Sequence, residues 1–142
     1  MAERVLLSLT VDGAPCAVEV WPAERLLDVL RERLGKLSVK EGCGEGECGA
    51  CAVLLDGRLV QSCLVPALRA QGVSVTTAEG LHGVAERFVA AGAVQCGFCT
   101  PGMEVAASTV APGASEGAVR EALSGNLCRC TGYQALVEGA RR

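Results

Sequence analysis

Eight of the nine cysteines in this chain of 142 residues form two groups, and their spacing constrains the fold more than any other feature. The first group consists of Cys43, Cys48, Cys51 and Cys63, and the second of Cys96, Cys99, Cys128 and Cys130. Where thiols stay reduced, such grouping indicates metal binding rather than disulfide bonds. The sequence therefore predicts a fold built around two thiolate sites.

The first group has the spacing C-x4-C-x2-C with a distal fourth cysteine, which is the spacing of plant-type 2Fe–2S proteins. Glycines at positions 42, 44, 46 and 49 would let the main chain curl around such a cluster and aim N–H groups at its sulfurs. Zinc and disulfides are the alternatives, but zinc sites favour C-x2-C pairs. The first group therefore predicts a 2Fe–2S site.

The second group combines a C-x2-C pair with a C-x-C pair further along the chain. Each pair directly precedes a predicted helix start, at Thr100-Pro101 and at Thr131, so two helix N-termini would face one anionic site. On spacing alone, zinc fits this group as well as iron–sulfur does. The presence of the first site favours a second 2Fe–2S cluster.

Residues 1–79 are predicted to form a small α+β domain. Asp12-Gly13 and Asp56-Gly57 are strong hairpin turn signals between apolar runs. A leucine stripe after Pro22 predicts a helix that stops at Gly35. The predicted strands are Val5–Val11, Cys16–Val20, Ala52–Asp56, Leu59–Ser62 and Val73–Thr77.

Residues 80–142 are predicted to form an all-helical domain, with the boundary between residues 78 and 81. Thr100 and Ser115 are predicted N-caps, and Thr131 with Gln134 fits a capping box. The predicted helices are Leu81–Ala91, Pro101–Val110, Ser115–Leu123 and a stretch opening at Thr131. Only 3% of the residues are aromatic, so both domains would have thin cores that a bound metal would stabilise.

Charge and hydropathy exclude several classes of function. The formal net charge is −3 and there is no basic run, which argues against nucleic-acid binding. The first residues do not form a signal peptide, a twin-arginine leader or a membrane helix, so no membrane span is expected. Together with the grouped cysteines, this predicts a cytoplasmic protein.

Three motifs resemble those of the molybdenum hydroxylases, the xanthine oxidase family. They are EGCGEGECGAC at residues 41–51, QCGFCTPG at residues 95–102 and GNLCRCTGY at residues 125–133. All eight grouped cysteines match in the same order, and the resemblance covers nearly the whole chain. The chain is similar to the separate small iron–sulfur subunit of the bacterial three-subunit members.

The resemblance implies a β-grasp 2Fe–2S ferredoxin domain followed by a four-helix 2Fe–2S domain, with the eight grouped cysteines as ligands. The molybdenum-pterin cofactor and FAD would lie on a large and a medium partner subunit, in a heterotrimer or a dimer of heterotrimers. Electrons would pass from molybdenum through the second cluster and then the first to FAD, during hydroxylation of a purine, another N-heterocycle or an aldehyde. The chain itself would hold no catalytic residue.

The same resemblance assigns two residues to the pterin. The residues that match Gln95 and Cys130 approach the molybdenum cofactor in the family, and an amide offers the pterin edge both a donor and an acceptor. A local hydrogen bond at a helix end is the alternative role for Gln95. The ninth cysteine, Cys16, is predicted to be a core thiol on a strand.

Two other functions compete with that of a hydroxylase subunit. One is a stand-alone, two-cluster ferredoxin-like electron carrier or redox sensor, against which the helical domain argues. The other is a structural zinc protein with an unusual second site. Iron content and the presence of partner subunits distinguish the three.

Overall fold

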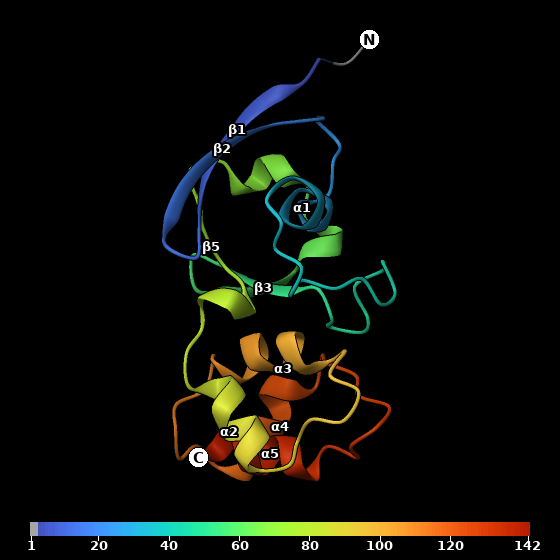
Figure 1. Cartoon of the computed structure of the whole chain (residues 1–142), viewed down its shortest axis with the longest axis vertical. Coiled ribbons are helices and arrows are strands. Elements are labelled where there is room, and N and C mark those ends of the chain that lie inside the picture. Colours follow the sequence, from blue (N-terminus) through green and yellow to red (C-terminus); the bar gives the residue numbers. More distant parts are fainter. Residues whose placement is uncertain (1–2) are drawn as a thin grey trace.

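The computed structural model describes residues 3–142 and places a strand-rich half above a helical half (Figure 1). The strand-rich half contains strands β1 (Val5–Val11), β2 (Ala14–Val20), β3 (Ala52–Leu55), β4 (Arg58–Gln61) and β5 (Ser74–Thr76). Its helical turns are α1 (Leu26–Asp28), η1 (Val29–Arg33), η2 (Ser62–Leu64), η3 (Ala67–Ala70) and η4 (Ala78–Gly80). The other half contains α2 (Val84–Ala90), α3 (Thr100–Ala107), α4 (Glu116–Leu123) and α5 (Gln134–Arg141). The predicted order, a strand-rich unit followed by a helical one, is confirmed.

The five strands form one mixed sheet in the order β2-β1-β5-β3-β4. Strands β1 and β2 form an antiparallel hairpin, as do β3 and β4, whereas β5 lies parallel to β1. At the first turn, Asp12 and Gly13 have φ values of 51° and 81°, and Asp56 and Gly57 repeat this geometry at the second turn. Both turns have the left-handed residues that a tight hairpin needs, so the predicted hairpins are confirmed.

The sheet curls around α1 and η1, as Figure 1 shows. Alternate residues of β1 point inward, so Leu7 and Leu9 pack against Leu26 and Leu30. The predicted helix begins only at Leu26, and its second part widens into a π-type turn. The predicted stop is confirmed, because the chain leaves the helix at Gly35 with a φ of 68°.

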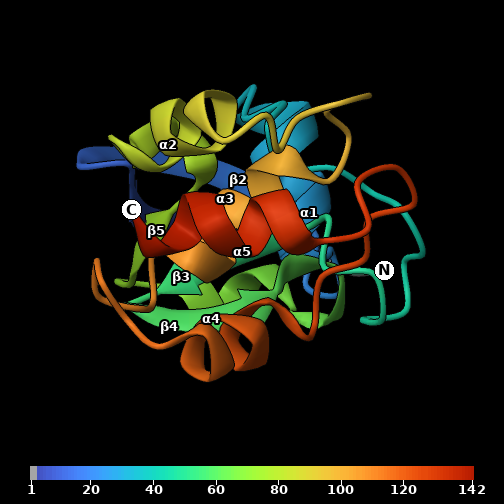
Figure 2. The ribbon, with the colours of Figure 1, turned by 90° about the horizontal axis from the view of Figure 1, so that it is seen from below.

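Helices α2 to α5 enclose a second core (Figure 2). Its largest fully buried side chains are Phe88, Met103 and Leu136. The predicted cap at Ser115 is confirmed, since its hydroxyl accepts a hydrogen bond from the Ala118 N–H at 3.2 Å.

Three predicted helix starts are wrong. Helix α2 begins at Val84, because Gly83 has a φ of 85° and breaks the helix before it. Cys99 occupies the N-cap position of α3, and the Thr100 hydroxyl is buried without a hydrogen-bond partner among residues 3–142. Helix α5 begins at Gln134 rather than Thr131, because Tyr133 takes a left-handed conformation with a φ of 70°.

Charged side chains anchor the segment that joins the two halves. The Asp12 carboxylate accepts hydrogen bonds from the Thr77 N–H at 2.7 Å and the Thr77 hydroxyl at 2.8 Å. Lys36 Nζ lies 2.8 Å from the same carboxylate. This network ties the start of the joining segment to the first hairpin, and the predicted domain boundary near residue 79 falls within that segment. No helix among residues 3–142 is long and apolar enough to cross a membrane.

Candidate iron–sulfur centres

The loop of residues 42–51 turns several main-chain N–H groups toward one sulfur. The N–H groups of Glu45, Glu47 and Cys48 each lie 3.4 Å from Cys43 Sγ. These hydrogen bonds lower the pKa of Cys43 to about 7, because they stabilise the thiolate. The loop therefore provides the donors that an anionic cluster needs, as the glycine pattern predicts.

The four thiols of the first group contact one another in pairs. Cys43 lies beside Cys48 at the exposed side of the loop, and Cys51 lies beside Cys63 in the interior. Burial raises the pKa of Cys63 to about 11, and its neighbour Cys51 adds to the rise. Two thiols per metal atom is the arrangement that a cluster of two irons requires.

Gly42 shows how closely the main chain of this loop approaches the cysteine sulfurs. A Cβ on Gly42 would lie 2.7 Å from Cys48 Sγ, so a side chain at this position would displace the thiol. The loop therefore depends on glycine next to its sulfur, which fits a main chain that encloses a cluster closely.

Arg25 holds the beginning of this loop, and sequence reasoning gave it no role. Its guanidinium donates to both Asp28 carboxylate oxygens at 2.7 Å and to Glu41 Oε1 at 2.8 Å. The hydrogen bonds that Arg25 donates to Asp28 and Glu41 raise the pKa of Arg25 above its ordinary value. Because Glu41 lies two residues before Cys43, these bonds fasten the loop to α1.

The second group of cysteines lines a cavity of about 290 Å³ beside the start of α3. Its thiols again meet in pairs, Cys99 with Cys128 and Cys96 with Cys130. Cys96 and Cys130 are exposed, while the other two are half-buried. Burial raises the pKa of Cys99 to about 12, with a further rise from Cys128. The structure therefore brings all four predicted residues of the second group together.

Only one of the two predicted helix N-termini faces this site directly. Cys99 occupies the N-cap position of α3, whereas α5 starts four residues after Cys130. Burial opposes ionisation of Cys128, but hydrogen bonds from Thr131, from the Cys130 main chain and from Cys99 together lower its pKa. The Thr131 hydroxyl lies 3.1 Å from Cys128 Sγ. Thr131 therefore supports a thiolate instead of capping a helix.

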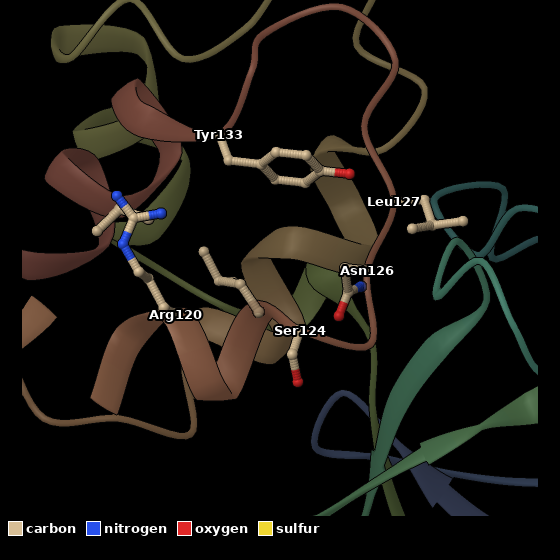
Figure 3. Close-up of a pocket in the computed structure, with 7 residues that line it drawn as sticks. Arg120, Ser124, Asn126, Leu127 and Tyr133 are labelled. Carbon is tan, nitrogen blue, oxygen red and sulfur yellow. The ribbon is translucent and has the colours of Figure 1, made fainter. Parts of the chain in front are cut away.

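Tyr133 shapes the second site, and sequence reasoning treated it only as part of a motif. Its hydroxyl accepts a hydrogen bond from the Cys128 N–H at 2.9 Å. Figure 3 shows the ring of Tyr133 pointing from the start of α5 toward the segment that carries Asn126 and Leu127. A positive φ on a bulky residue is unusual and marks a position held by its surroundings.

Other predicted residues lie at the open side of the second site. Gln95 and Cys130 are exposed, and Phe98, beside Cys99, is 46% exposed. Cys16, in contrast, is half-buried against the first core, where its thiol lies 3.6 Å from the Leu9 carbonyl oxygen. Among residues 3–142, no three His, Cys, Asp or Glu side chains converge as ligands of one metal ion do.

Family models match both halves of the chain. The model described as a 2Fe-2S iron-sulfur cluster binding domain matches residues 9–78. The model described as a 2Fe-2S binding domain matches residues 70–141. The two thiolate sites thus belong to two successive 2Fe–2S binding domains.

Relatives of known function and solved structures agree with these matches. The chain is 43% identical to the xanthine dehydrogenase iron-sulfur-binding subunit of Escherichia coli O157:H7, over 96% of this chain and 92% of that subunit. It is 42% identical to the nicotinate dehydrogenase small FeS subunit of Eubacterium barkeri, over 92% and 88% of the two chains.

Quinoline 2-oxidoreductase from Pseudomonas putida 86 has a similar structure, with a TM-score of 0.94, 40% identity and coverage of 99% of this chain and 92% of that chain. The aldehyde oxidoreductase of Desulfovibrio desulfuricans is 43% identical, with a TM-score of 0.90, but this chain matches only 16% of its length. The chain belongs to the molybdenum hydroxylase family, as one of its small iron–sulfur subunits for electron transfer.

Proposed function

We propose that this chain carries electrons from a large molybdenum-pterin subunit to a medium FAD subunit in a heterotrimer or a dimer of heterotrimers. The observation that carries the proposal is that eight free thiols gather at two sites, one in each half. Relatives of nearly the same length are named as small subunits of larger dehydrogenases, which supports the partners. The reaction of the complex would be hydroxylation of a purine, another N-heterocycle or an aldehyde.

The eight grouped cysteines are the proposed ligands, and each contacting pair would hold one iron. Cys43 and Cys48 would share one iron of the first cluster, and Cys51 and Cys63 the other. Cys96 with Cys130 and Cys99 with Cys128 would do the same in the second cluster. A 2Fe–2S cluster takes up and releases one electron at a time, while the main-chain N–H groups around Cys43 stabilise the thiolate charge.

The proposed direction of electron flow, from molybdenum through the second site and then the first, is the one that membership of this family implies. The second site has three exposed residues at its edge, Gln95, Cys96 and Cys130. This exposure would let a partner's cofactor approach, and we propose this site as the one nearer the pterin. Gln95 and Cys130 would contact the pterin itself, the amide through its donor and its acceptor. The first site would then pass electrons on to FAD.

The finer fold and location are part of the same proposal. The mixed sheet around α1 supports a β-grasp ferredoxin domain over residues 1–79, and α2 to α5 support a four-helix domain over residues 80–142. The grouping of eight cysteines as proposed metal ligands supports a place in the reducing cytoplasm.

The purified, reconstituted chain is expected to bind about four irons and to give two distinct paramagnetic resonance signals on reduction, because each 2Fe–2S cluster holds two irons. Elemental analysis and low-temperature spectroscopy measure both. Stoichiometric zinc with little iron would contradict the clusters and support the structural zinc protein.

Isolation of the tagged chain from its native host is expected to bring down a molybdenum-containing subunit and a flavin-containing subunit in equal amounts. Mass spectrometry, metal analysis and flavin fluorescence identify them. A chain that elutes alone under mild conditions, with both clusters present, would favour the stand-alone carrier.

A further inference from the structure

The chain segments that carry the two thiolate sites contact each other at two consecutive main-chain carbonyls of the first loop. The Leu127 N–H donates to the Cys48 carbonyl oxygen at 2.9 Å, and Asn126 Nδ2 donates to the Gly49 carbonyl oxygen at 3.0 Å. Cys48 belongs to the first site, and Leu127 directly precedes Cys128 of the second. The hydrogen bond from Leu127 to Cys48 therefore links a cysteine of the first site to the residue beside Cys128 of the second site.

The contact is too close for side chains larger than hydrogen. A Cβ on Gly49 would lie 2.5 Å from the Gly125 carbonyl oxygen and 2.6 Å from Asn126 Nδ2. A Cβ on Gly102 in α3 would lie 2.3 Å from the Gly49 carbonyl oxygen. Both glycines thus allow the helical half to reach the backbone of the first loop, in addition to any role in curling that loop.

Asn126 is an unusual residue for this buried position. It is only 3% exposed, and its Oδ1 has no hydrogen-bond partner among residues 3–142. An unpaired buried carbonyl costs free energy, so an apolar side chain of similar size would pack here more favourably. Within the described residues 3–142, the amide makes the one bond from Nδ2 to Gly49, which spans 77 residues of sequence.

Figure 3 shows where this bond lies in the molecule. Asn126 sits on the segment between α4 and the second cysteine pair, and Leu127 reaches toward the teal loop of the first half. Leu127 is 58% exposed, and its hydrogen bond to the first loop is made by its main-chain N–H. The Asn126 side chain, one residue earlier, holds that N–H in register with the Cys48 carbonyl.

We propose that Asn126 is a positioning residue that keeps the two clusters in electronic contact across the hydrogen bond between Leu127 and Cys48. The inference rests on the proposed pair of clusters. With both clusters bound, an electron passing from a reduced second site to an oxidised first site would cross this bond, which would oxidise the second site and reduce the first without moving a proton. Electronic coupling falls steeply where a gap replaces a bonded contact, so loosening the bond would separate the sites electronically.

Asn126→Leu removes the donor while keeping a side chain of similar size. The Gly49 carbonyl keeps its second donor, the Ala52 N–H at 3.2 Å, so the first loop retains a partner. In the full reconstituted chain with both clusters reduced, paramagnetic resonance of the wild type is expected to show a splitting from spin–spin interaction between the clusters. The variant is expected to lose this splitting while keeping both separate signals and the wild-type iron content.

Gly102→Ala provides a second variant that acts from the opposite side. Alanine favours the helix, but its Cβ would push against the Gly49 carbonyl, so the splitting should again be lost with the iron retained. Ser124→Ala is the matched control in the same segment, because its hydroxyl donates to Glu121 within its own half. The control should keep the splitting.

Two outcomes would overturn the inference: a wild-type chain with both clusters but no splitting, or a full splitting in Asn126→Leu or in Gly102→Ala. A loss of one signal or of iron from the wild-type chain would instead contradict the proposed clusters. The spectroscopic splitting thus separates a positioning role from a merely structural one.

Discussion

A chain carrying Cys51→Ser is expected to bind about two irons in place of about four and to lose one of its two paramagnetic resonance signals. Cys51 is 3% exposed and lies against Cys63, which is 4% exposed. A buried serine hydroxyl is a poor substitute for a thiolate, because it does not ionise near neutral pH. Without its partner, the Cys63 thiol would not hold an iron, and the first cluster would not assemble.

Cys99→Ser is expected to have the mirror effect and to remove the other signal. Cys99 occupies the N-cap position of α3 and contacts Cys128 inside the second site. Since the two sites lie in separate cores, each change should leave the remaining cluster intact. Iron analysis and spectroscopy of the two variants side by side assign each signal to its site.

Cys16→Ser is the matched control for both changes. Cys16 is half-buried and contacts the Leu9 carbonyl oxygen, and a hydroxyl can make the same contact. Iron content and both signals should therefore stay at the wild-type level. Loss of both signals from either ligand variant, or of iron from the control, would contradict two independent sites with the proposed ligands.

Much of this architecture could be predicted because its signals are local in sequence. Asp12-Gly13 and Asp56-Gly57 specify tight turns within two residues, and the structure has hairpins at both places. The grouped cysteines likewise identify their own neighbours, and all eight lie in the predicted groups. Ser115 caps a helix as its position predicts.

The wrong helix starts arose where a local signal competed with a distant contact. Thr131 has the residue type and spacing of a cap, but its hydroxyl donates to Cys128 Sγ. The Tyr133 hydroxyl accepts a hydrogen bond from the Cys128 N–H, and Tyr133 takes a left-handed conformation. Helix α5 therefore begins only at Gln134. The rules for helix capping consider only residues near the start of one helix. They do not include a hydrogen bond from the predicted cap residue to a cysteine thiol just before it.

The contacts between the two halves could not be predicted, because no periodic pattern in the sequence indicates them. Asn126 reaches Gly49, 77 residues earlier, through one side-chain hydrogen bond, and Arg25 joins Asp28 to Glu41 within the first half in the same unannounced way. The sequence pattern predicts that Gly49 serves the curl of the first loop, but its contact with Asn126 also requires glycine. Such joint demands on one residue become visible only when both segments are placed together.

The second prediction with a large effect concerns Glu104 in α3. Glu104 is 9% exposed, and burial raises the pKa of its carboxyl group from an ordinary value of 4.5 to about 7, with a further rise from Glu86. The folded chain therefore holds the proton more tightly than the unfolded chain. At pH values well below 4.5 the carboxyl group is protonated in both states, so it does not lower the free energy of unfolding.

Above pH 4.5 the unfolded chain releases the proton first, so stability falls as the pH rises toward 7. Above that value both states are ionised and the loss is complete, at about 3 kcal/mol from the size of the pKa shift. Glu104→Gln removes the ionisable group while keeping its size. The variant is expected to be more stable than the wild type by about 3 kcal/mol at pH 8, and by less than about 1 kcal/mol at pH 5.

Thermal unfolding of the reconstituted wild type and variant at both pH values measures this difference. For a chain of this size, about 3 kcal/mol corresponds to a midpoint roughly 6–12 °C higher for the variant at pH 8. Glu121→Gln on α4 is the matched control, because the Glu121 side chain is exposed and its loss should change neither midpoint by more than about 1 °C.

The comparison between pH 5 and pH 8 isolates the charge from the packing. A gain for Glu104→Gln that is equal at both pH values would mean that the amide improves contacts within the helical core, and would contradict a buried ionisation. A gain confined to pH 8 would locate the cost in the carboxylate itself. Because α3 also bears Cys99 at its N-cap and approaches the Gly49 carbonyl through Gly102, that cost acts on the helix that joins the two sites.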